Sequence, residues 1–197
     1  QMCIRDRCSA LRGFTDAECG VIASQQGHIM RLWTVADPGD SLFLRRKAVP
    51  LGREELQSAH FRMLKEGMLA TVCDTTDRGV GIAAPQVGVS RRLIAVQRFD
   101  KPGEPFCFYV NPEIVWYSQT RLPGSEGCLS IPGVSGSVLR SERIVVRYLD
   151  EESLRMAADT VEGFTAVIFQ HEVDHLDGIL YTCLLYTSPS PRDMRRS

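Results

Sequence analysis

The stretch His171-Glu172-Val173-Asp174-His175 organises the rest of this sequence. On a helix the two histidines lie one turn apart on the same face, because a turn takes about 3.6 residues, so their ring nitrogens can converge on one cation. Glu172 is rotated by roughly 100° from His171 and can reach a water molecule at the metal without binding the metal itself. The pattern H-E-x-x-H on a helix is typical of metal-dependent hydrolases. The alternative is a pair of core histidines satisfied by hydrogen bonds.

The neighbouring sequence supports a helix over residues 161–176. Phe164, Val167, Ile168 and the histidine pair recur at helical spacing and predict one buried stripe. We expect the helix to begin at the capping or first-turn residues Asp159, Thr160 and Glu162. We expect it to end just before Gly178.

Charge and cysteine content limit the possible classes of protein. With 23 basic and 24 acidic residues the net charge is -1, which gives no electrostatic basis for binding nucleic acid or a membrane surface. No apolar run is long enough to span a bilayer, and polar residues interrupt residues 1–30 too often for a signal peptide. The 7 cysteines are odd in number and lack paired spacing, which favours a reducing cytoplasm over a disulfide framework.

We expect a single catalytic domain at residues 30–183 of the 197-residue chain. We expect the natural protein to start near Met30 and interpret residues 1–29 as a non-native or disordered extension. Deletion of residues 1–29 is expected to leave folding and activity intact. Residues 184–197 lose all periodicity and resemble vector or adapter sequence, which predicts a non-native disordered tail. A regulatory Ser-Pro tail is the alternative.

Between these ends, helix signals are followed by strand signals. Residues 53–73 have apolar side chains close to helical spacing and predict the first helix, preceded by a turn at residues 37–40 and an extended connector at 42–50. Strands followed by one late helix indicate an α+β fold with an antiparallel or mixed sheet. The strands are predicted at residues 92–97, 107–110 and 114–117, and residues 138–148 are predicted as two strands of a hairpin or a meander.

The glycine-rich stretch at residues 79–88 predicts a loop whose backbone approaches a ligand closely. It presents the amide of Gln86, a hydrogen-bond donor that cannot ionise. The stretch also fits the dinucleotide pattern G-x-G-x-x-A, but that pattern needs a strand before it and a helix after it. Pro85 and Gly88 forbid a regular helix there.

Cys128 lies in the polar, glycine-rich stretch at residues 125–133, which predicts a loop. A cysteine in such a loop is placed to use its sulfur. The alternative is a buried structural thiol, the usual state of a free cysteine.

Three stretches in series resemble the peptide deformylases: Gly79-Val-Gly-Ile-Ala-Ala-Pro-Gln86, Glu126-Gly-Cys-Leu-Ser130 and Gln170-His-Glu-Val-Asp-His175. They follow the family's order at about its separations, and the resemblance covers about residues 30–180. It implies a compact α+β domain in which antiparallel or mixed sheets wrap the helix that carries the histidines. It also implies removal of the N-formyl group from N-formylmethionine on nascent chains at the ribosome, by a cytoplasmic monomer of bacterial type, with an organellar origin left open.

The resemblance further implies a metal centre. Cys128, His171 and His175 would be the ligands of one divalent ion, iron(II) in its native state, with zinc, nickel or cobalt able to substitute. A thiolate ligand tolerates ferrous iron as well as zinc. The family usually continues after this helix into a further strand and often a helix, and the tail replaces that region here.

The remaining roles follow from the same resemblance. Glu172 would be the general base, while the Gln86 side chain and the Leu129 backbone N–H would stabilise the oxyanion. Asp174 would orient a metal-bound imidazole, with Arg140 as its ionic partner. The residues expected to bind substrate are Gly79, Val80, Gly81, Ile82, Glu126, Gly127, Phe164 and Val167.

Two other functions fit the H-E-x-x-H motif. A zinc endopeptidase would cleave internal peptide bonds and take a third ligand downstream, where the sequence offers Asp177 but no histidine. A catalytically silent metal-binding module would hold an ion and release no formate.

Overall fold

A computed structural model describes residues 13–24, 29–74 and 78–185. Its helices are α1 (Asp16–Ala23), α2 (Pro38–Leu44), α3 (Arg53–Gln57), α4 (Ala59–Val72) and α5 (Gly163–Leu176), with short 3-10 turns η1 (Ala84–Val87) and η2 (Tyr181–Cys183). Its strands are β1 (Gly81–Ala83), β2 (Leu93–Gln97), β3 (Phe106–Tyr117), β4 (Arg121–Cys128), β5 (Ile131–Ser141), β6 (Arg143–Leu149) and β7 (Met156–Glu162).

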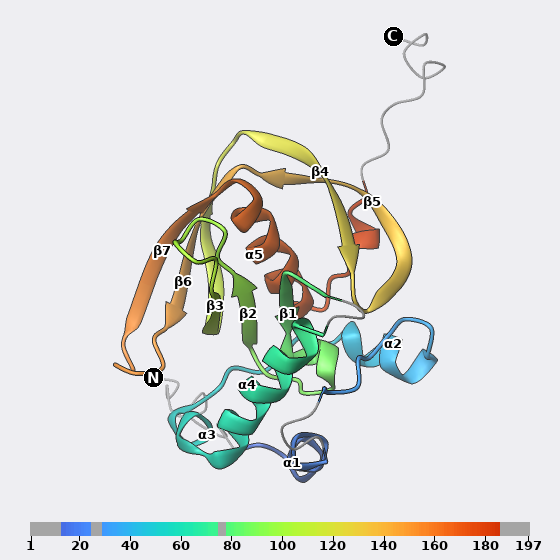
Figure 1. Ribbon diagram of the computed structural model, residues 1–197, viewed down its shortest axis with the longest axis vertical. Helices are drawn as coiled ribbons and strands as arrows, with labels where there is room; N and C mark the ends of the chain where they lie inside the picture. Colours follow the sequence, from blue (N-terminus) through green and yellow to red (C-terminus); the bar gives the residue numbers. More distant parts are fainter. Residues whose placement is uncertain (1–12, 25–28, 75–77, 186–197) are drawn as a thin grey trace, which may run out of the picture.

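Two antiparallel sheets surround α5 (Figure 1). One has five strands in the order β1-β2-β3-β6-β7, and the other is the β4–β5 hairpin, which arches over the helix. Helix α5 contacts strands of both sheets. Helices α1, α3 and α4 lie together below the sheets in Figure 1, where α4 contacts β1. The predicted α+β fold with antiparallel sheets around the metal helix is confirmed.

Apolar side chains fix the orientation of α5 against the larger sheet. Phe169 and Leu176 are fully buried, and Ile168 and Val173 nearly so, in one cluster with strand residues such as Ile94. Burial of each such side chain contributes roughly 1.5–3 kcal/mol. With this face held by the sheet, the histidine face of α5 turns toward the end of β4.

Helix α5 begins later than predicted. Asp159 and Thr160 belong to β7 and pair with β6, and Glu162 occupies the N-cap position without a side-chain hydrogen bond. Gly163 has a φ of 62°, a left-handed conformation that glycine adopts at least cost, and the chain turns there from strand directly into helix. The predicted end is confirmed, since Gly178 follows α5 with a φ of 74°.

The predicted helix at residues 53–73 is two helices. Ser58 has extended backbone angles (φ -78°, ψ 157°) and breaks the run between α3 and α4, where its side chain accepts a hydrogen bond from the Phe61 N–H. Helical spacing continues on both sides of the break, so spacing alone did not reveal it. Part of the predicted connector at 42–50 belongs to α2, which Asp37 caps.

Three further predictions about strands differ from the structure. Residues 138–148 do not form a hairpin or a meander, because β5 pairs with β4 whereas β6 pairs with β3 and β7 of the other sheet. The predicted loop at residues 125–133 forms the ends of β4 and β5, which pair as a hairpin. The predicted strands at 107–110 and 114–117 are one strand, β3, with an irregular pairing next to Asn111, whose φ is 49°.

The expected N-terminal extension is helical in part. Residues 16–23 form α1, which packs against α4, and Glu18 of this helix accepts hydrogen bonds of 3.0 and 2.9 Å from Arg91. The physical reason is that the buried Arg91 guanidinium requires carboxylate partners. That the extension is dispensable for activity stays a prediction, and residues 1–12 and 25–28 lie outside the described residues.

At the other end, Leu185 forms an isolated bridge with Val138 of β5. Residues 186–197, most of the predicted tail, lie outside the described residues. Among the helices that the structure describes, none combines the length and the apolar character needed to cross a bilayer.

Candidate metal centre

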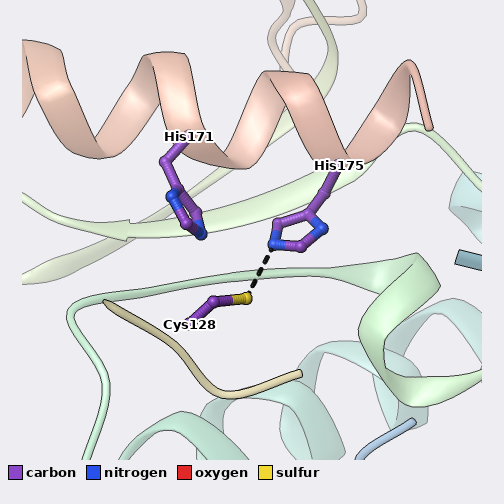
Figure 2. Close-up of side chains that lie close together, drawn as sticks. All are labelled: Cys128, His171 and His175. Carbon is purple, nitrogen blue, oxygen red and sulfur yellow. Dashed lines mark hydrogen bonds between the residues drawn. The ribbon is translucent and has the colours of Figure 1, made fainter. Parts of the chain in front are cut away.

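Three potential metal ligands meet between α5 and the end of β4 (Figure 2). His171 and His175 project one turn apart from the same face of α5, as their spacing predicts. Cys128, the last residue of β4, lies opposite them, with its Sγ 3.2 Å from His175 Nε2. One ligand atom from each of the three residues lies within 4.8 Å of the others. The structure therefore brings together the ligand set that the sequence predicts.

The geometry of this cluster fits a divalent transition metal. Metal–sulfur and metal–nitrogen distances of about 2.3 and 2.1 Å place tetrahedral donors roughly 3.5 Å apart, close to the 3.2 Å between Cys128 Sγ and His175 Nε2. His171 Nδ1 is 2.8 Å from Glu126 Oε2, which leaves Nε2 for an ion, the usual arrangement of a ligating histidine. A thiolate with two imidazoles suits zinc or iron.

A buried chain of charges supports His171. Glu126 accepts hydrogen bonds from Arg140 Nε and Nη2 at 2.7 and 3.1 Å, in addition to its contact with His171. Arg140 Nη1 donates to Asp174 at 2.5 Å, so the predicted ion pair is present. The carboxylate beside the imidazole is nevertheless Glu126, for which a substrate-binding role was predicted, and not Asp174. Strand β4 places Glu126 two residues before Cys128, within reach of the same histidine pair.

Burial and these charges shift the pKa values of groups on α5. Burial raises the pKa of the Glu172 carboxyl to about 7, against the opposing effect of His171. Burial lowers the pKa of His175 well below its usual value. It also lowers that of His171, but hydrogen bonds to Cys128 and Glu126 outweigh burial and raise the pKa to about 10. A metal ion bound here would take the place of that proton, because imidazole binds metal only when neutral.

Glu172 and Gln86 face the same cavity as the ligand cluster. Glu172 is 4% exposed, and its Oε2 lacks a hydrogen-bond partner among the residues that the structure describes. Gly81 leaves room for this carboxylate, because a Cβ there would come within 2.5 Å of Glu172 Oε1. Gln86 Oε1 accepts a 2.8 Å hydrogen bond from the Ala83 N–H, which leaves the amide NH2 toward Cys128 Sγ at 3.6 Å.

The cluster opens into a cavity of about 610 Å³, a size typical of small-ligand sites. Leu129 and all predicted substrate-binding residues except Ile82 line this cavity; Ile82 is fully buried in the hydrophobic core. Phe164, predicted to lie on the buried stripe, is 55% exposed at the cavity. Arg78 and Val134 also line this cavity, although the sequence does not predict them as substrate-binding residues. The sequence signal for Arg78 is its position directly before the glycine-rich stretch.

Comparison with known proteins identifies the family. Residues 29–186 match the family model described as polypeptide deformylase. The chain is 48% identical over 139 residues to a peptide deformylase of Symbiobacterium thermophilum, a match that covers 71% of this chain and 60% of that protein. It is 42% identical over 153 residues to a peptide deformylase of Xylella fastidiosa strain M12, covering 78% of this chain and 86% of that protein.

Solved structures agree with this match. The class I type b peptide deformylase of Acinetobacter baumannii, described as K3U bound, has a TM-score of 0.71 and 38% identity, covering 80% of this chain and 99% of that one. The peptide deformylase of Thermotoga maritima has a TM-score of 0.70 and 32% identity, covering 81% and 99%. The resemblance carried by the three sequence stretches is confirmed. This chain belongs to the peptide deformylases, a family of metal-dependent enzymes that remove the N-formyl group from newly made polypeptides.

Proposed function

We propose that this chain hydrolyses the N-formyl group of N-formylmethionine on newly made polypeptides, releasing formate and a free N-terminus. The observation that carries this proposal is that, in a member of the deformylase family, Glu172 and Gln86 face one cavity together with the Cys128 and His171 ligands. A general base, an uncharged amide donor and a metal cluster are the groups that amide hydrolysis requires.

We propose iron(II) as the native ion at Cys128, His171 and His175, with zinc, nickel or cobalt able to replace it. The mixed thiolate and imidazole donors support this choice. A bound divalent ion supplies Lewis acidity, which polarises a carbonyl oxygen and lowers the pKa of water to about 7. Glu126 and Arg140 keep the His171 ring in the orientation and tautomer that leave Nε2 available.

The chain's own residues move the protons and stabilise the charge. Glu172 accepts a proton from the attacking water and delivers it to the amine nitrogen as the carbon–nitrogen bond breaks, and a pKa of about 7 suits both transfers. The formyl oxygen gains negative charge during the attack. The Gln86 amide and the Leu129 backbone N–H donate to that oxygen, and one such donor contributes about 3 kcal/mol.

The lining of the cavity supports a peptide substrate with an apolar first side chain. Phe164 and Val167 offer an apolar wall for it. A structure of the Acinetobacter baumannii deformylase, 36% identical with a TM-score of 0.71, is described as Met-ala-ser bound. We therefore propose that residues 79–82 and 131–133 pair with an extended formyl-methionyl chain as an added strand. We also propose that the enzyme is a monomer that acts on such chains at the ribosome, in the cytoplasm.

Replacement of Glu172 by Ala tests this proposal. The variant is expected to retain its metal and to release formate from a formyl-Met peptide at least about 100-fold more slowly than the parent chain, the usual contribution of a general base. Elemental analysis after anaerobic purification and a formate assay measure the two properties.

The same experiment separates the other functions. Near-normal turnover in the Glu172 variant would remove that residue as the base. Cleavage of an internally quenched peptide in place of formate release would indicate an endopeptidase. A parent chain that holds metal and releases no formate would be a silent metal-binding module.

A further inference from the structure

One exposed charge stands at the cavity among the described residues that line it. The two lining carboxylates, Glu126 and Glu172, are only 6% and 4% exposed, and the former is held by Arg140. Arg78 is exposed and lines the same cavity. Arg78 takes part in none of the arginine ion pairs that join described residues. Its exposed guanidinium can therefore meet a charge on a bound molecule.

The position of Arg78 along the chain indicates which part of a substrate it meets. Gly81 marks the reacting end, because a Cβ there would touch the carboxylate of Glu172. Arg78 lies three positions before Gly81, so the two are at most about 10 Å apart along the chain, at roughly 3.3 Å per extended residue; β1 begins only at Gly81. An extended peptide covers that distance with its first three residues, and we therefore place its third residue from the formyl end next to Arg78.

We propose that Arg78 makes this enzyme prefer formyl-methionyl peptides with an acidic side chain at their third residue. The inference rests on the proposed function, since it requires a peptide whose formyl group faces Glu172. The rest of the mouth, which includes Val80, Val134 and Phe164, is uncharged and does not select by charge. Because the guanidinium is exposed, water and salt screen the interaction, and the preference is modest and depends on salt.

Three matched peptides test the preference on the metal-loaded chain: formyl-Met-Ala-Asp-Ala, formyl-Met-Ala-Asn-Ala and formyl-Met-Ala-Lys-Ala. We expect kcat/KM for the Asp peptide to exceed that for the Asn peptide by about twofold to fivefold, the range of an exposed ion pair. The kcat/KM for the Lys peptide should be lower than that for the Asn peptide, and the differences in kcat/KM should become smaller at about 0.5 M salt. Equal kcat/KM for the three peptides would overturn the inference.

Two variants assign the preference to this residue. Arg78→Gln should abolish it and Arg78→Glu should reverse it toward the Lys peptide. Arg121→Glu is the matched control, because it makes the same charge change at another exposed arginine. Arg121 is the first residue of β4 and therefore lies at the end of that strand away from Cys128, its last residue. The control should keep the parent preference. A preference that survives in Arg78→Gln would contradict the proposal, whereas no formate from the Asn peptide with the parent chain would count against the proposed function itself.

Discussion

Arg140 and Arg91 are both buried arginines that bind two carboxylates each, but only one of these groups touches the metal centre. Arg140 is 7% exposed and donates to Glu126 and Asp174. Arg91 is 5% exposed and donates to Glu18 and Glu55. The local chemistry of the two groups is the same.

The two groups differ in the other hydrogen bonds that their carboxylates accept. Glu126 uses its second oxygen to accept from His171 Nδ1, so the Arg140 group sets the orientation of a metal ligand. Glu18 and Glu55 instead accept from backbone N–H groups at the starts of short helices, at Thr15 and Gly52. One group therefore supports chemistry and the other joins α1 and α3 to the domain.

Replacing Arg140 by Met should have the largest effect in this comparison. The change leaves the buried Glu126 and the partly buried Asp174 without their cation, which costs about 3–5 kcal/mol of the free energy of unfolding. The His171 ring also loses its support, so metal affinity should fall about 10-fold to 100-fold. Chemical denaturation and metal titration measure the two effects; unchanged metal affinity would separate the Arg140 group from the centre.

Replacing Arg91 by Met is the matched change in the other group. We expect a loss of about 3 kcal/mol in the free energy of unfolding, because Glu55 is fully buried and loses its partner. Metal content and formate release per folded chain should equal those of the parent. Metal loss in this variant as large as in the Arg140 variant would erase the distinction between the groups.

Acid should weaken the Arg91 group by a smaller amount. Burial raises the pKa of Glu18, but hydrogen bonds from Arg91 and Thr15 outweigh burial and hold the pKa below its ordinary value. The contribution of the ionised carboxylate is therefore complete above the unfolded-state pKa and is lost as the pH falls through the folded-state pKa. We expect Glu18→Gln to cost roughly 1–2 kcal/mol at pH 7 and less as the pH falls below about 4. A cost that grows on acidification would contradict this sign.

The same two groups mark the limit of prediction from sequence. The ligand pair His171 and His175 was predictable because their spacing on one helix is a local property. The sequence does not identify Glu126 as the partner of His171, because the glycine-rich stretch around Cys128 predicts a loop. In a strand, residues two apart share a face, which would have linked Glu126 with Cys128.

Other differences arise where tertiary contacts decide the local structure. Asp159 and Thr160 suit a helix start by composition, but pairing with β6 holds them in β7. Helix α1 starts with a capping box of Thr15 and Glu18, which is a local signal, but the distant Arg91 fixes its place in the fold. Sequence patterns within a short window do not contain such partners.

The metal content of Cys128→Ser tests the central claim most directly, with Cys107→Ser as a control for loss of a thiol from the partly buried strand β3. Each chain is purified without oxygen and its iron and zinc are measured per folded chain. The account predicts about one ion per chain for the parent and the control, as a site of three ligands implies, and a clear loss or exchange of metal in Cys128→Ser. An unchanged ion and stoichiometry in Cys128→Ser would contradict the assignment of this sulfur to the metal centre.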